Sequence, residues 1–176
     1  MSVSANIEQY INLSKINGKL CKWDKNVINV FITDITANIN NKTYYYMEIE
    51  RAMNLWNEIF AQNNIYIRFN KVTTPINADI IIHWTKVGRV FEGMCKYVSV
   101  INGILKKISI DIGLPNSFSP KEVTNESIFS AIMHEFGHAL GLGHGIDVDD
   151  IMYVPHQKNI SQPSENDLYV LKIIYK

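Results

Sequence analysis

The chain has 176 residues, 47% of them hydrophobic, and its 17 basic side chains balance 17 acidic ones. That length fits a single domain, and the hydrophobic fraction excludes an intrinsically disordered chain. Zero net charge argues against a nucleic acid or a membrane surface as a partner, and no apolar run approaches the roughly 18 residues of a membrane span.

The N-terminal segment, residues 1–22, is polar with scattered apolar positions, and we expect an extension that wraps the domain or frays. It lacks the basic start and apolar stretch of a secretory signal. A cytoplasmic protein is therefore expected, or a secreted one if the sequence is a mature form or leaves by an unconventional route. Cys21 and Cys95 lie far apart without C-x-x-C spacing, which predicts two reduced thiols rather than a disulfide or a thiolate metal site.

The next part of the chain alternates strands with one long helix. β-Branched residues predict a strand over 27–35, and residues 65–69 alternate as a second strand. Residues 78–84 are almost continuously apolar, which predicts a strand buried on both faces, with His83 packed or hydrogen-bonded inside it and not a metal ligand. Helical spacing of apolar residues predicts an amphipathic helix over 43–62. Its buried stripe is Ile49, Ala52, Met53, Trp56, Ile59 and Phe60.

Two further β-like runs follow, at residues 94–101 and 104–112. Asn102 and Gly103 join them, and both residue types tolerate the positive φ of a type I′ turn. The sequence therefore predicts a β-hairpin here, followed by a loop over 113–121 that contains glycine and two prolines.

Two helices complete the prediction. Residues 126–140 are expected to be helical, and Ser164 with Asp167 three residues later indicates the capped start of a last helix. The packing stripe of that helix is Leu168, Leu171 and Ile174 or Tyr175. This order predicts an α/β fold, with one mostly parallel, twisted sheet of five strands, an antiparallel edge strand and three helices, in a single domain over 23–176.

Three of the five histidines lie within the stretch HEFGHALGLGH. On a helix, His134 and His138 are four residues apart and lie on one face, close enough to share a cation. Gly141 can end the helix in the left-handed conformation, so that the chain returns and brings His144 to the same ion. Imidazole suits Zn²⁺, and three protein ligands leave a fourth position open for water, as in catalytic zinc sites. Glu135 lies beside the metal without binding it, where a general base belongs.

The alternative to a metal site is a helix that happens to carry surface histidines. The H-E-x-x-H pattern alone has many chance matches. A glycine and a third histidine at fixed spacing make a chance match far rarer, so the sequence favours a zinc site.

HEFGHALGLGH, followed by Ile151, Met152 and Tyr153, resembles the metzincin clan of zinc endopeptidases, and specifically its matrixin (matrix metalloproteinase-like) branch. The resemblance runs from about Trp23 to Tyr175. It implies an α+β metzincin-like fold in which the catalytic zinc lies in a cleft. It also implies that the chain is a minimal catalytic domain.

The resemblance also gives roles to three residues outside the histidine motif. It implies that Met152 is the Met-turn residue beneath the zinc ligands, and that Pro155 belongs to the segment that walls the S1′ pocket of the substrate site. In the family, the residue four positions before the first zinc histidine influences the depth of this pocket. That residue is Ser130 here. Because serine is small, we expect a deep pocket that takes a large apolar side chain.

The chain departs from the family pattern in three places. Gly145 follows the third histidine where matrixins have a serine. Between residues 85 and 113 there is no histidine, and the only acidic residues are Glu92 and Asp111. One catalytic zinc is therefore expected, without a structural zinc or calcium. No pro-segment motif surrounds Cys21, which we expect to be a free thiol.

These features lead to the hypothesis of a zinc-dependent endopeptidase that hydrolyses extended peptide or protein substrates. Glu135 would take a proton from a zinc-bound water that attacks the scissile carbonyl, and would pass it to the leaving amine. The substrate would pair as an extra strand with residues 94–101. We expect the chain to act as a monomer.

Two other functions stay open. One is a catalytically silent, zinc-dependent protein-binding module, and the other is a narrowly specific self-processing or effector protease. The presence of Glu135 counts against the first, because binding alone needs no base. His156 has no role in any of these hypotheses.

Overall fold

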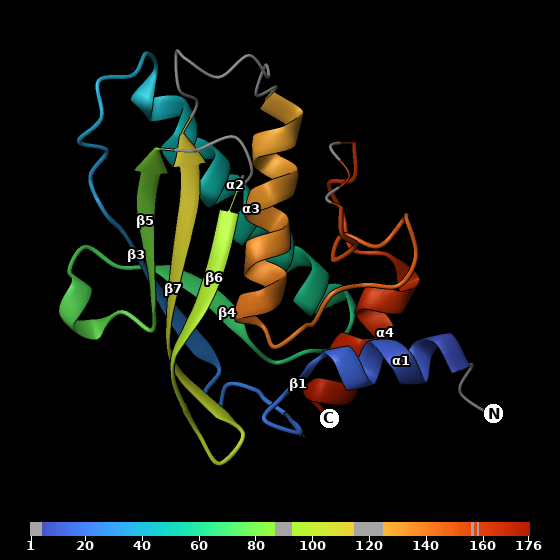
Figure 1. The fold of residues 1–176 in the computed structure, drawn as a ribbon. Coiled ribbons are helices and arrows are strands. Elements are labelled where there is room, and N and C mark those ends of the chain that lie inside the picture. The colour runs from blue at the N-terminus through green and yellow to red at the C-terminus, as the bar shows by residue number, and fades with distance from the viewer. Residues whose placement is uncertain (1–4, 87–92, 115–124, 156, 158) are drawn as a thin grey trace.

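The computed structural model describes residues 5–86, 93–114, 125–155, 157 and 159–176. A five-stranded sheet in the order β4-β3-β5-β7-β6 forms its centre (Figure 1). β3 pairs in parallel with β4 and β5, β5 pairs in parallel with β7, and β6 pairs antiparallel with β7. The strands are β3 (Val27–Ile32), β4 (Arg68–Lys71), β5 (Ile80–Lys86), β6 (Gly93–Ile101) and β7 (Ile104–Leu114). The predicted sheet, mostly parallel with an antiparallel edge strand, is confirmed.

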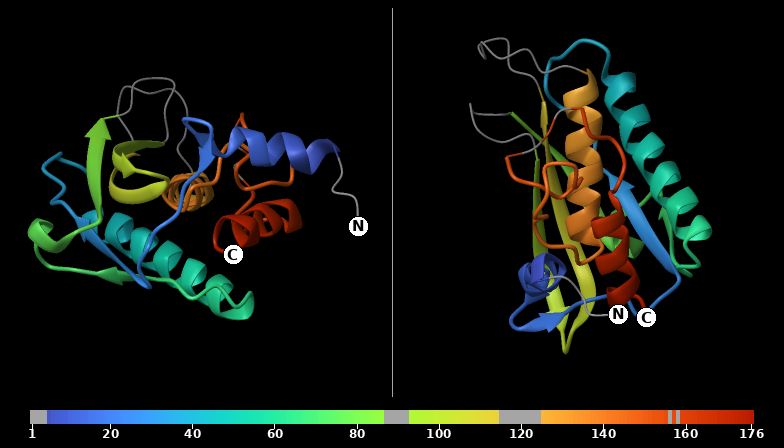
Figure 2. Two further views of the ribbon diagram at one scale, coloured as in Figure 1. Left: turned by 90° about the horizontal axis from the view of Figure 1, so that it is seen from below. Right: turned by 90° about the vertical axis from the view of Figure 1, so that its right-hand side faces the viewer.

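Helices α2 and α3 cover one face of this sheet, and α1 lies beside α4 (Figure 2). In the described residues the α-helices are α1 (Ala5–Leu13), α2 (Lys42–Gln62), α3 (Asn125–Ala139) and α4 (Glu165–Ile174). The remaining elements are a 3-10 helix, η1 (Pro75–Asn77), and a two-stranded ribbon of β1 (Lys15–Ile16) and β2 (Lys19–Leu20). None of the helices in this part of the chain is long and apolar enough to span a membrane.

The hydrophobic core lies between the sheet and helices α2 and α3, and its packing fixes the position of α3. All six residues of the predicted stripe on α2 are buried. Phe69 of β4 contacts Phe60 of α2 and Phe136 of α3, with ring centroids 5.7 and 4.8 Å apart. Each fully buried side chain of this size contributes roughly 1.5–3 kcal/mol to folding. α3 is thereby fixed against the sheet, with the edge strand β6 beside it.

Two local predictions are confirmed in detail. Asn102 and Gly103 have φ values of 53° and 82°, as a type I′ turn requires, and they join β6 to β7. Ser164 caps α4, and its side chain accepts a hydrogen bond from the Asp167 amide. The Asp167 side chain in turn accepts from the Ser164 amide, which completes a capping box.

Other expectations need correction. The sequence predicts three helices, and the structure adds α1, whose apolar Ile7, Tyr10 and Ile11 share one helical face. These residues have the i, i+3, i+4 spacing of an amphipathic helix, and the burial of Tyr10 against the domain stabilises a helix that is too short to be stable by itself. The strand expected over 65–69 is shifted, since β4 starts at Arg68.

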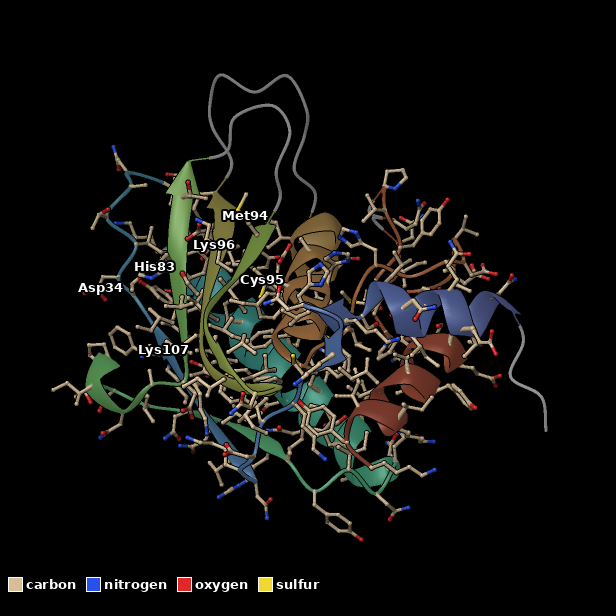
Figure 3. All side chains as sticks on the ribbon, turned by 60° about the horizontal axis from the view of Figure 1, so that its bottom comes forward. Asp34, His83, Met94, Cys95, Lys96 and Lys107 are labelled. Carbon is tan, nitrogen blue, oxygen red and sulfur yellow. The ribbon has the colours of Figure 1, made fainter. Side chains whose placement is uncertain are left out.

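The strand around His83 is also different from the prediction. Ile80 and Ile82 of β5 are buried, whereas Ile81 is half-buried and His83 is exposed (Figure 3). The described helices cover only one face of the sheet, so this strand is not buried on both faces. The loop expected over 113–121 begins after Leu114, and most of it lies outside the described residues.

Candidate active site

Helix α3 and the loop that follows it bring three histidines together. His134 and His138 lie on one face of α3, and Gly141, with a φ of 95°, reverses the chain after the helix. A Cβ atom on Gly141 would lie 2.3 Å from the carbonyl oxygen of Cys21, so only glycine fits this turn. His144 then returns, and one nitrogen from each ring lies within 4.8 Å of the other two. This group can hold a metal ion.

Backbone carbonyls fix the tautomers of two of these rings. The Nδ1 atom of His134 lies 2.8 Å from the Ile151 carbonyl oxygen, and that of His138 lies 2.9 Å from the Leu142 carbonyl oxygen. Because a carbonyl only accepts, Nδ1 carries the proton in each ring and Nε2 keeps its lone pair for a cation. Burial lowers the pKa of His138 to about 4, and partial desolvation also lowers the pKa of the more exposed His144. All of this fits neutral imidazole ligands for zinc.

Glu135 is buried beside the histidines, between α3 and the edge strand β6. The Cys95 backbone amide donates a hydrogen bond to its carboxylate. Within the described residues its Oε2 atom has no partner. Burial, which is the largest effect, raises the pKa of Glu135 to about 8; the Cys95 amide lowers this pKa and Asp111 raises it. A bound divalent cation would favour the charged form.

Gly93, at the start of β6, makes room for this carboxylate. A Cβ atom there would lie 2.6 Å from Cγ of Glu135 and 2.7 Å from its Oε1. The edge strand therefore approaches the glutamate more closely than a residue with a side chain would allow. Cys95 lies two residues further along the same strand (Figure 3).

Met152 packs directly beneath the histidine helix and is fully buried. A Cβ atom on Gly137 would lie 2.2 Å from the Met152 sulfur, so the glycine between the two helical histidines lets the sulfur approach α3. The Met152 carbonyl also accepts a hydrogen bond of 2.7 Å from the Gly145 amide. Met152 thus contacts both the helix and the loop that carry the histidines.

A close packing contact explains why this chain has a glycine at position 145, where the family has serine. A Cβ atom at this position would lie 2.6 Å from Cβ of Asp150. Asp150 is buried, and its Oδ2 atom accepts hydrogen bonds from the amides of Ile146 and Asp147. The carboxylate closes the loop after His144, and the glycine gives it the space to do so.

Ser130 and Pro155, the two residues expected at the substrate pocket, both form hydrogen bonds with Gln157. Ser130 of α3 is fully buried, and its hydroxyl contacts the backbone carbonyls of Gln157, at 3.0 Å, and Ile160. The Gln157 side chain donates to the carbonyl of Pro155, which is exposed. Ser130 therefore holds the segment after the Met152 turn against α3. The deep pocket itself stays a prediction, and His156 lies outside the described residues.

Residues far away in sequence support the end of α3. The Tyr97 hydroxyl donates to the His138 carbonyl at 2.9 Å, and Trp23 Nε1 donates to the Ala139 carbonyl at 2.8 Å. These bonds span 41 and 116 residues, so no local pattern indicates them. Cys21 and Cys95 are both free, and Cys21 is buried.

Comparison with known proteins agrees with this geometry. Residues 22–176 match the family model described as Matrixin. The macrophage metalloelastase of Oryctolagus cuniculus is 27% identical over 140 residues, which cover 74% of this chain and 28% of that protein. The aligned part of this chain thus covers less than a third of the length of that relative. The match to the family model takes in nearly the whole chain, and the chain belongs to the matrixin family.

Proposed function

We propose that this protein is a zinc-dependent endopeptidase, with His134, His138 and His144 as the zinc ligands and Glu135 as the general base. The observation that carries this proposal is the cluster of three imidazoles with a buried carboxylate beside it. The Oε2 atom of Glu135 has no partner in the described structure and is free to accept a proton. A purely structural metal site would not need such a group.

The residues present fit a zinc ion. The carbonyls of Ile151 and Leu142 orient two of the rings. Such a hydrogen bond from the ring nitrogen that does not bind the metal is typical of zinc histidines. We expect one zinc ion per chain, and no structural zinc or calcium. Zinc held by three histidines would polarise the scissile carbonyl and make a water molecule more acidic.

Glu135 would carry the proton in this reaction. Its carboxylate would take a proton from the attacking water and donate it to the nitrogen of the leaving amine. Burial between α3 and β6 excludes bulk water from the carboxylate, and the Cys95 amide fixes the orientation of the carboxylate. Met152 and the loop bonds at Gly145 would keep the histidines in place during turnover.

The substrate would bind as an extended strand along β6. This strand is at the edge of the sheet and pairs only with β7 among the described strands, so its outer backbone groups, apart from the Cys95 amide that bonds Glu135, can pair with a peptide. A peptide added here would run close to Glu135, because Gly93 brings the strand against that carboxylate. We therefore propose peptide or protein substrates in an extended conformation.

The specificity of cleavage tests the pocket assignment. In a peptide library we expect a preference for large apolar side chains at P1′, because a small serine at position 130 would leave the predicted pocket deep. The cleavage sites can be read by mass spectrometry of the products. A preference for glycine or alanine at P1′ would contradict the predicted depth, while cleavage itself would still support the proposed activity.

A further inference from the structure

The N-terminal helix ends directly on the loop that carries His144. The Gly143 amide donates a hydrogen bond of 2.9 Å to the Ser14 hydroxyl oxygen. A Cβ atom on Gly143 would lie 2.1 Å from the carbonyl oxygen of Leu13 and 2.6 Å from the Ser14 amide nitrogen. The residue before His144 is therefore held in backbone contact with the end of α1, and only glycine allows this approach.

Ser14 is itself fixed in orientation. It is 2% exposed, and its hydroxyl donates to the Tyr10 carbonyl at 3.0 Å, one turn earlier in the chain. The hydroxyl proton is thus used within α1, and a lone pair of the oxygen faces the Gly143 amide. The hydroxyl therefore donates to the Tyr10 carbonyl and accepts from the Gly143 amide, and these two bonds together fix its orientation.

Tyr10 anchors the helix to the rest of the domain. Its side chain is fully buried, and its hydroxyl donates to Asp167 Oδ1 at 2.5 Å. The other oxygen of Asp167 accepts from the Ile151 amide at 2.8 Å, next to Met152. α1 is consequently bonded to the loop with His144 and, through Asp167, to the turn beneath the histidines.

His144 has particular need of this support. The rings of His134 and His138 are each oriented by a backbone carbonyl, but in the described part of the chain no such bond holds His144, which is exposed. Its position then depends on its backbone neighbours. Gly143 is held by Ser14 and Gly145 by the Met152 carbonyl, one on each side of the histidine.

We propose that Ser14 is a positioning residue for the third metal ligand, and that α1 is in this way part of the metal centre. The inference rests on the proposed function in that it takes the three histidines to bind zinc. α1 and Ser14, which lie in the segment that the sequence suggests as an extension, would then contribute to the metal affinity of the domain. Ser14 would touch neither zinc nor substrate and would act on His144 through Gly143.

The test is the zinc dissociation constant of Ser14→Ala, measured on the whole chain by competition with a chromogenic chelator. We expect this constant to rise by about 10-fold, the usual effect of losing a bond that orients a ligand. The visible spectrum of the cobalt-substituted protein should change as well, because it reports the geometry of the ligands. Circular dichroism at the same temperature shows that the variant is folded.

Asn12→Ala is the matched control, because Asn12 is an exposed residue of α1 whose side chain bonds only to Lys15 in the described structure. We expect wild-type zinc affinity in this variant. Wild-type affinity and an unchanged cobalt spectrum in Ser14→Ala would overturn the inference. Absence of zinc binding by the wild-type chain would instead refute the proposed function, so the two failures are distinct.

Discussion

Glu135→Ala is expected to lower kcat for peptide hydrolysis by about 10²–10⁴-fold while the protein still binds one zinc ion. The carboxylate is the buried group beside the three histidines, and its Oε2 atom has no other partner in the described structure. Removing it takes away the proton acceptor but leaves the imidazoles and their carbonyl partners in place. The measurement is the initial rate on a quenched fluorescent peptide, with zinc content determined on the same samples.

Two further variants make this result specific. Glu135→Gln keeps the size of the side chain but cannot take up a proton at neutral pH, so it should lose as much activity as the alanine variant. Glu165→Ala removes an exposed carboxylate at the start of α4 and should have wild-type activity. Cleavage at an undiminished rate by zinc-loaded Glu135→Ala would refute the assignment of the base.

Asp167→Ala is expected to lower the free energy of unfolding by about 3 kcal/mol or more. Asp167 is fully buried and accepts hydrogen bonds from the Tyr10 hydroxyl and from the amides of Ile151 and Ser164. Without the carboxylate these three donors lose their acceptor, and each buried orphan costs about 1–3 kcal/mol. Urea unfolding followed by tryptophan fluorescence measures the change.

The control for this variant is Asp149→Ala, in the loop after His144. Asp149 is exposed, and we expect a change of at most about 0.5 kcal/mol. Equal stability of the two variants would show that Asp167 does not join α1, α4 and the turn at Met152 as the hydrogen bonds indicate.

The parts of the site that the sequence predicts are those built by local rules. His134 and His138 share a face because a helix repeats every 3.6 residues, and Gly141 adopts the positive φ that glycine favours. The turn at Asn102 and Gly103 and the capping box at Ser164 follow from residue preferences in the same way. Each of these features depends on residues close together in the chain.

The parts that could not be predicted depend on distant contacts. Ser14 bonds to Gly143 across 129 residues, and Tyr10 bonds to Asp167 across 157 residues. A serine and a tyrosine in a polar segment carry no signal of such partners. The exposure of His83 cannot be predicted for a related reason, because an apolar strand does not reveal which of its faces the helices cover.

The most direct test of zinc-dependent peptide hydrolysis is a metal titration. The protein is stripped with a chelator, zinc is added back in known amounts, and the cleavage of a peptide is followed at each step. We expect negligible cleavage without metal and a rate that rises linearly to one zinc per chain and then levels off. Full cleavage by the metal-free protein, or a zinc-loaded protein that cleaves no peptide in the library, would contradict the proposal.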